Sequence, residues 1–222
     1  MLRKSYINQK RKLKVVLTLF IEFWSVTTQV TEEKTSIKIH KPGFNERIFF
    51  LISGAIMSVP LTLFITQFAD PFLSGFSNVA STLISVAVLA PLIEEFSKIY
   101  PLFYRHGETQ RSIFNLALLV GLGFGIVEFF TYVFGLGTNP INRIPGLFFH
   151  PASTSISAYG IGVGKPFQFY AIAVSLHFAN NFLAVTNPYP VPTSLIIVLI
   201  TVFTSYKLYN KTKEKFIDLK CY

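Results

Sequence analysis

The sequence has few cysteines and few charged residues. Cys221 is the single cysteine among 222 residues, which excludes an internal disulfide and a metal site built from several thiolates. Its position also argues against thiol catalysis, because it lies outside every long apolar run. Charged residues make up only 14% of the chain, against about a quarter in typical soluble domains. The low charge and the lone cysteine argue against a soluble globular enzyme and against a secreted disulfide-stabilised domain.

Hydrophobic residues, in contrast, make up 51% of the chain, and 24 of its residues are phenylalanine. Most of them form runs of about 17–25 residues with almost no charge, which is the length that a helix needs to cross the bilayer core. We therefore expect an all-α fold, a polytopic transmembrane helix bundle with about six spans and an N-terminal interfacial helix. The predicted spans are residues 48–69, 79–103, 113–135, 146–163, 167–187 and 192–207.

The positive charges predict the orientation of these spans. Residues 15–30 are apolar but short and contain Glu22, so we interpret them as an interfacial amphipathic helix. With six spans and a cytoplasmic N-terminus, every Lys and Arg except Arg143 lies on the cytoplasmic side. The net charge of +9 therefore reports membrane topology and not a nucleic-acid partner. We predict a multi-pass protein of the cell membrane with both termini cytoplasmic. Its three regions are a basic N-terminal segment (1–47), a transmembrane domain (48–207) and a basic tail (208–222).

Ionisable and amide side chains interrupt four of the predicted spans. A charged group at the centre of a span costs about 2.5–3.5 kcal/mol on insertion scales, whereas each Leu, Ile, Phe or Val returns only about 0.3–0.6 kcal/mol. Packing alone is a poor explanation for so many of these groups, so we expect them to face one another in a shared polar cavity. They are Glu94, Glu95 and Lys98 in the second span, Glu128 in the third, His150 in the fourth, and His177, Asn180 and Asn181 in the fifth.

Their spacing gives more specific expectations. Glu94 and Lys98 are four residues apart, so they share a helix face on which opposite charges can pair. We expect His150 at the buried tip of a re-entrant segment, 141–149, with a helix beginning at Pro151. Each group also has a purely structural interpretation. Glu94 and Lys98 could form a salt bridge near the cytoplasmic end of their span, and Glu128 could be a packed polar group. His150 could cap a helix, and His177 with Asn181 could form hydrogen bonds between helices.

Carboxylates and imidazoles in a membrane cavity suit two kinds of peptide hydrolysis. In the first, a Glu activates water as general base while His and Asn donors stabilise the oxyanion. In the second, His and Glu ligands hold Zn²⁺, which acidifies the water. The spans contain no Asp for a Ser-His-Asp triad, and the sequence has no HExxH motif. A proton- or ion-coupled carrier and an inactive membrane scaffold remain alternatives, although carriers usually show repeated halves and none is evident here.

Four short motifs in this order resemble the PrsW family of intramembrane proteases, which is related to the CAAX prenyl endopeptidases and the bacteriocin-immunity (Abi) proteins. The similarity covers roughly residues 85–185. The four motifs are EEFSK (Glu94, Glu95, Lys98), FGIVE (Phe124, Glu128), HPAST (His150, Thr154) and HFANN (His177, Asn181).

The resemblance implies a membrane endopeptidase that acts on a membrane-anchored or lipidated protein. By position, Glu94 would be the base that activates water, and Glu95 would orient Glu94 or share its proton, with Lys98 neutralising the pair. Asn181 stands where PrsW-like proteins carry Asp, which favours glutamate-activated water over a zinc cofactor. The remaining roles implied are completion of the site by Glu128 and His150, and an oxyanion-binding side formed by His177 and Asn181.

Overall fold

The computed structural model of the protein describes residues 41–104, 109–187 and 190–217, which belong to one compact unit. Among these residues there is no β-strand, and an isolated β-bridge joins Thr109 to Phe216. The all-α prediction is therefore confirmed for the described chain. Its helices are α2 (Phe44–Ser53), η1 (Gly54–Ser58), α3 (Val59–Leu73), α4 (Asn78–Thr82), η2 (Leu83–Leu89), α5 (Ala90–Ile99), η3 (Tyr100–Tyr104), α6 (Gln110–Phe130), η4 (Thr131–Gly135), η5 (Pro140–Asn142), α7 (Ile144–Gly162), α8 (Pro166–Thr186) and α9 (Pro190–Tyr209).

Some of these helices follow one another without a break, and the first three predicted spans each lie on such a continuous helical stretch. The last three predicted spans lie largely on α7, α8 and α9. In the described residues, four helices are long and apolar enough to cross a membrane. The number of spans and their orientation stay predictions, and the helix predicted over 15–30 lies outside the described residues. The four helices are Phe44–Ile65, Asn78–Tyr104, Gln110–Gly135 and Pro166–Thr186, and Thr193–Tyr209 is a shorter apolar helix.

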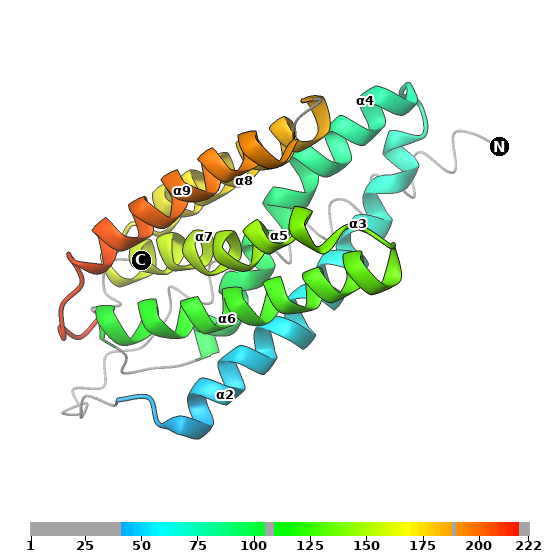
Figure 1. The fold of residues 1–222 in the computed structure, drawn as a ribbon. Coiled ribbons are helices and arrows are strands. Elements are labelled where there is room, and N and C mark those ends of the chain that lie inside the picture. The colour runs from blue at the N-terminus through cyan, green and yellow to red at the C-terminus, as the bar shows by residue number, and fades with distance from the viewer. Residues whose placement is uncertain (1–40, 105–108, 188–189, 218–222) are drawn as a thin grey trace. The chain divides into compact units, whose positions relative to one another are not determined.

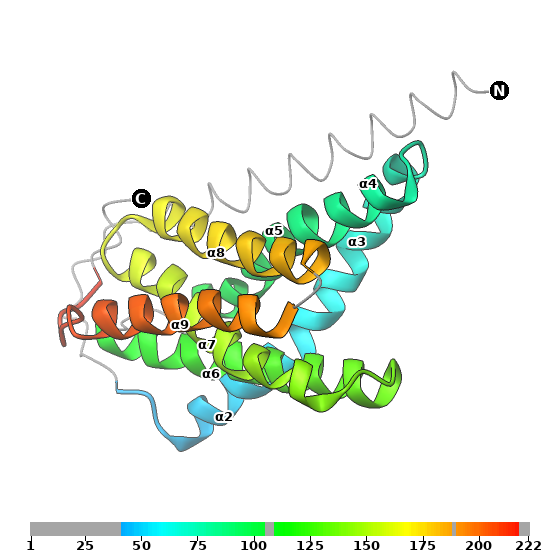
Figure 2. The same ribbon diagram turned by 45° about the horizontal axis from the view of Figure 1, so that its top comes forward.

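Helix α7 lies between α6 on one side and α8 and α9 on the other (Figure 1; Figure 2). Its central turn is polar but buried: Ser153, Thr154 and Ser155, which point in different directions around the helix, are fully buried. Their hydroxyls bond to carbonyl oxygens of the preceding turn or to neighbouring side chains. Because its neighbours shield α7, this helix needs no apolar surface of its own, and it can present polar side chains to the interior of the bundle.

The start of α7 differs from our prediction. The helix begins at Ile144, with Pro145 in its first turn, so His150 lies inside a regular helix and not at the tip of a re-entrant segment. Proline is well suited to a first helical turn, and it is Pro145 that occupies this position. Pro151, where we expected the helix to start, is an interior residue. The expected re-entrant segment 141–149 and the helix start at Pro151 were therefore wrong.

Glycines allow α6 to approach its neighbours closely. A Cβ atom on Gly123 would lie 2.0 Å from the carbonyl oxygen of Leu51 in α2, and one on Gly54 would lie 2.0 Å from the carbonyl oxygen of Val120. On the opposite side, a Cβ on Gly121 would lie 2.4 Å from the carbonyl oxygen of His150. These contacts are between backbones, so no side-chain rotation relieves them. The position of α6 between α2 and α7 therefore depends on its glycines.

We predict that Gly123→Ala destabilises the folded protein by about 1–3 kcal/mol, because the added methyl group forces α2 and α6 apart. The measurement is reversible unfolding of purified protein in mixed detergent micelles. Gly135→Ala is the matched control, since no atom lies within 4 Å of the Cβ position at that helical glycine. Equal stabilities of the two variants would contradict the prediction.

The residues after α9 bind the start of α6. Thr109 caps α6, and its hydroxyl also donates to Oε2 of Glu214 at 3.0 Å. Arg111 donates from its guanidinium to the backbone carbonyl of Thr212 at 2.7 Å and to the Thr212 hydroxyl at 3.0 Å. The part of the predicted tail that the structure describes, up to residue 217, is therefore packed against the bundle.

Candidate active site

The side chains predicted to share a cavity do lie together. Helix α5 carries Glu94, Glu95 and Lys98, while single residues come from α6 (Glu128) and α7 (His150), and α8 carries His177 and Asn181. Glu95, Lys98, His150 and His177 are each at most 3% exposed. Four helices thus place ionisable groups in the interior of the bundle, as the sequence predicted.

Glu95 is the most heavily bonded group of the site. Its Oε1 atom accepts from Nζ of Lys98 at 2.6 Å, from Nδ1 of His177 at 2.8 Å and from the Ser153 hydroxyl at 3.0 Å. Three donors on one oxygen hold this carboxylate rigidly. Glu95 therefore orients its neighbours and is poorly placed to move toward a substrate.

From the four-residue spacing we expected Lys98 to pair with Glu94. In the structure it pairs with Glu95 instead. Its Nζ atom also contacts Nδ1 of His150 at 3.1 Å and lies 5.0 Å from the centroid of the Phe124 ring. An ammonium group can only donate, so Nδ1 of His150 accepts and the proton of a neutral ring lies on Nε2. Lys98 thus fixes the orientation of His150 while compensating the charge of Glu95.

Glu128 links the buried cluster to the loop before α7. Its Oε2 atom is hydrogen bonded to Nε2 of His150. Its Oε1 atom lies 3.9 Å from the guanidinium of Arg143, and that group stacks 3.4 Å from the centroid of the Tyr132 ring. The Glu128 side chain is 24% exposed, so it lies at the margin of the buried site.

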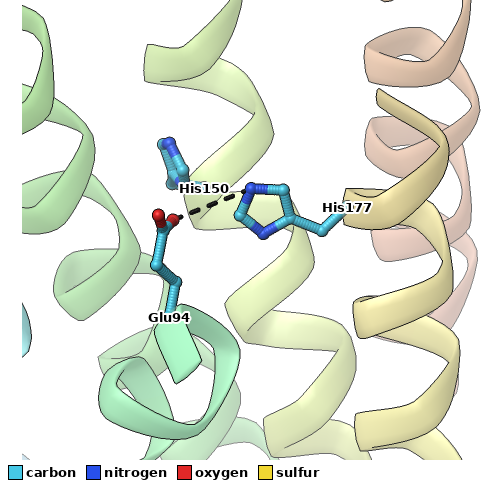
Figure 3. Close-up of side chains that lie close together, drawn as sticks. All are labelled: Glu94, His150 and His177. Carbon is cyan, nitrogen blue, oxygen red and sulfur yellow. Dashed lines mark ion pairs between the residues drawn. The ribbon is translucent and has the colours of Figure 1, made fainter. Parts of the chain in front are cut away.

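Among the described residues, Glu94, His150 and His177 form a group that could hold a metal ion. One potential ligand atom from each lies within 4.8 Å of the other two. Figure 3 shows the three side chains converging from α5, α7 and α8. Oε2 of Glu94 lies 3.7 Å from Nε2 of His177. This Glu94 oxygen is buried, and no described group forms a hydrogen bond to it. The carboxylate of Glu95 on Nδ1 of His177 is the outer-shell partner that metal-binding histidines usually have.

A cavity of about 90 Å³ adjoins this group. Its walls come from the ends of α6 and α8 and from the beginnings of α7 and α9. The residues lining it include Glu128, Arg143, His150, His177, Asn180 and Asn181. The two histidines and Glu128 border this cavity, whereas Glu94, Glu95 and Lys98, which we expected to share it, are not among the residues that line it.

Asn181 lines this cavity, and its side chain also forms a hydrogen bond with helix η2. In η2 the hydrogen bonds span five residues, as in the bond from Ala90 N to the Ser85 carbonyl. The next such bond, to the Val86 carbonyl, would come from residue 91, which is a proline without an N–H group. The Asn181 side chain donates to this Val86 carbonyl at 3.0 Å instead. The π-helical turn and Pro91 thus fix the side chain of Asn181.

Two residues of the site were not among our predicted site residues. Ser153 donates to Glu95, and its position three residues after His150 on the same helix face was a usable signal. Arg143 contacts Glu128. Its sequence signal was its place as the one basic residue on the predicted non-cytoplasmic side. Ser153 lies inside the HPAST motif but is not one of the residues compared there, His150 and Thr154, and Arg143 lies outside all four motifs.

Comparison with known families adds independent evidence. Residues 45–206 match the family model described as PrsW family intramembrane metalloprotease. No curated protein and no solved structure is significantly similar to the chain. The match leaves the relation to the CAAX and Abi proteins as a prediction. It covers most of the chain and includes the four helices that meet at the site, so this protein is a membrane protease that belongs to the PrsW family of intramembrane metalloproteases.

Proposed function

We propose that this enzyme is an endopeptidase that hydrolyses a peptide bond of a membrane-associated protein with a water activated at Glu94, His150 and His177. One observation carries the proposal: the buried Oε2 atom of Glu94 has no hydrogen-bond partner in the described structure and lies 3.7 Å from Nε2 of His177. A buried carboxylate oxygen without a partner is costly, and such groups are typical of catalytic or metal-binding sites. Oε2 of Glu95 is also buried without a partner, but Glu94 is the carboxylate that lies in one group with His150 and His177.

Glu94, His150 and His177 would hold a metal ion, and their oxygen and nitrogen ligands suit Zn²⁺. When bound, the ion would supply an acidified water and a Lewis acid for the substrate carbonyl. His150 is engaged with Glu128 through Nε2, so that nitrogen becomes available as a ligand only when the Glu128 bond opens. The metal-free alternative, predicted from the sequence, has Glu94 itself as the base.

The remaining residues have roles that follow from their contacts. Attack of the water oxygen on the carbonyl carbon forms a C–O bond, and breaking of the C–N bond releases an amine. Glu128, at the margin of the cavity, would take the water proton and return it to that amine when Glu94 serves as a ligand. Glu95 positions His177, and Lys98 positions His150. Asn181 lines the cavity, but the oxyanion role that the resemblance implies for it and His177 has no donor from His177, whose one N–H bonds to Glu95.

The predicted topology indicates on which side of the membrane the cavity lies. The lining residues lie at the end of the bundle that contains Arg143 and the beginnings of α7 and α9. Lys165 and Lys207 lie at the opposite ends of α7 and α9. With both termini cytoplasmic and six spans, the cavity faces the non-cytoplasmic side.

Residues 48–207 then form the protease domain, between the basic segment 1–47 and the tail 208–222. A membrane-anchored regulator and a lipidated peptide are the two candidate substrate classes.

Metal binding is tested by elemental analysis. We predict about one divalent metal ion per chain of purified protein, and loss of both the metal and the activity on treatment with a chelator. His177→Ala is expected to abolish binding, because it removes a ligand. His106→Ala is the control, since the sequence places His106 in the predicted cytoplasmic loop. Full activity in metal-free protein would instead establish the glutamate mechanism.

The function itself is tested in cells. Membrane-protein fragments that accumulate with the active enzyme, but not with Glu94→Gln, identify substrates by mass spectrometry of the membrane fraction. Cleavage sites are expected at or near the non-cytoplasmic end of a membrane span. An identical fragment pattern in both strains would show that the chain is not an active protease under those conditions, and would support the inactive scaffold.

A further inference from the structure

Asn180 precedes Asn181 on α8 and lines the same cavity, and the resemblance to the family gives it no role. Its Nδ2 atom donates to Oδ1 of Asn181 at 3.3 Å. Its Oδ1 atom is buried, and no described group donates a hydrogen bond to it. A buried amide oxygen without a donor is destabilising, so this atom calls for a partner that the described chain does not supply.

The orientation of the Asn180 amide is determined by hydrogen-bond chemistry. The Val86 carbonyl can only accept, so Asn181 must direct its NH₂ group to Val86 and its oxygen to Asn180. The Asn181 oxygen can also only accept, so Asn180 must direct its NH₂ group toward it. Oδ1 of Asn180 is therefore the atom left without a partner. It suits an N–H group of a ligand and cannot stabilise an oxyanion.

Arg143 offers the complementary group at the same cavity. Its Nε atom is buried, and no acceptor bonds to it within the described residues. Stacking on Tyr132 and the contact with Glu128 hold the guanidinium in place. Two residues that line the cavity thus carry one unsatisfied acceptor and one unsatisfied donor. A polypeptide backbone carries both an N–H and a C=O group in every peptide unit.

The size of the cavity narrows what can enter. Its volume of about 90 Å³ is far below the roughly 300–1,000 Å³ of pockets that enclose whole small-molecule ligands. It is several times the roughly 10–15 Å³ of accessible volume that one water molecule needs. A peptide group fits this space better than a large side chain does. Recognition through the main chain is therefore favoured over recognition of a particular residue type.

We propose that Asn180 and Arg143 form a subsite for an unwound substrate backbone, in which Oδ1 of Asn180 accepts a peptide N–H and Nε of Arg143 donates to a peptide carbonyl. The proposal rests on the endopeptidase function above and adds the form in which the substrate is bound. An unwound segment in a membrane must find partners for its free N–H and C=O groups, and the two side chains supply them. The substrate is thus a chain that leaves its helix at the cleavage site.

The test is a binding measurement, so that it does not depend on turnover. The probe is an end-blocked, fluorescein-labelled decapeptide of alternating alanine and serine, titrated with Glu94→Gln protein in detergent and followed by fluorescence anisotropy. Adding Asn180→Leu, which removes the acceptor at similar volume, is expected to raise Kd about 3- to 10-fold. Adding Arg143→Met is expected to raise Kd about 10-fold or more, because its donor is charged. Asn78→Leu and Arg47→Met, at exposed positions, are controls expected to leave Kd within twofold.

A second series separates a direct contact from a structural effect. Probes in which one backbone N–H is replaced by an ester oxygen are scanned along the peptide. One of them is expected to lose affinity as Asn180→Leu does, with no further loss when the two changes are combined. The proposal is overturned if the Glu94→Gln parent does not bind the probe, if Asn180→Leu leaves Kd unchanged, or if every ester effect is additive with it. Binding that depends on Asn180, in a protein whose unsubstituted form cleaves nothing, would instead contradict the proposed function alone.

Discussion

Replacement of Glu94 by glutamine is expected to lower the rate of substrate cleavage by at least about 100-fold, the usual minimum contribution of an acid–base group. Glutamine has nearly the size and shape of glutamate, so packing around α5 is retained. What is lost is the carboxylate oxygen that faces His177 at 3.7 Å, which serves as base or as metal ligand. Cleavage of a substrate found by the fragment analysis, reconstituted with purified enzyme in liposomes, gives the rate.

The matched control is Glu46→Gln. Glu46 lies in the first turn of α2 and accepts from the backbone N–H of Gly43 at 2.8 Å, away from the site. The Glu46→Gln variant is expected to cleave the substrate at the rate of the unsubstituted enzyme. If Glu94→Gln retained full activity, neither the base nor the ligand role would stand. If Glu94→Gln unfolded, the comparison would be repeated with Glu94→Asp, which keeps the charge and is expected to retain a folded chain with a reduced rate.

The fold was largely predictable because the bilayer imposes strong rules. Long apolar runs form helices, and breakers such as Lys165-Pro166 lie between them. What the sequence did not predict correctly was the start of α7. Two prolines, Pro145 and Pro151, stand six residues apart, and either can begin a helix. The choice depends on tertiary packing, because α6 contacts the backbone at His150 and Pro151 through Gly121.

The site was predictable in composition but not in connectivity. Isolated ionisable residues on four spans indicated a shared cavity, because none of them is stable alone in lipid. The partner of Lys98 was misassigned, since Glu94 and Glu95 are both within helical reach and only His177 and Ser153 decide between them. The link from Pro91 through Val86 to Asn181 was also beyond sequence reasoning, because it depends on a π-helical turn that no residue pattern predicts reliably.

Removal of the Lys98 charge is expected to have the largest effect on stability. Lys98 and Glu95 are both 0% exposed and 2.6 Å apart, so Lys98→Met leaves an uncompensated buried carboxylate. Breaking a buried ion pair from one side typically costs about 3–5 kcal/mol. The measurement is reversible unfolding in mixed detergent micelles. The control is Lys207→Met, an exposed lysine at 4.4 Å from the Phe203 ring, for which we expect a loss of no more than about 1 kcal/mol.

The double variant Lys98→Met with Glu95→Gln separates folding from function. It removes both charges, so we expect it to recover most of the stability that Lys98→Met loses, because a neutral pair needs no compensation. Cleavage should nevertheless stay strongly reduced, since His150 has lost the ammonium group at 3.1 Å that orients its ring, and His177 is left with a weaker, uncharged acceptor in place of Glu95. A double variant that recovered stability and full activity together would show that the pair serves the fold alone. Recovery of stability without activity would place the pair in the positioning of the two histidines, and would explain why a charge pair is kept in a membrane interior where apolar residues would be more stable.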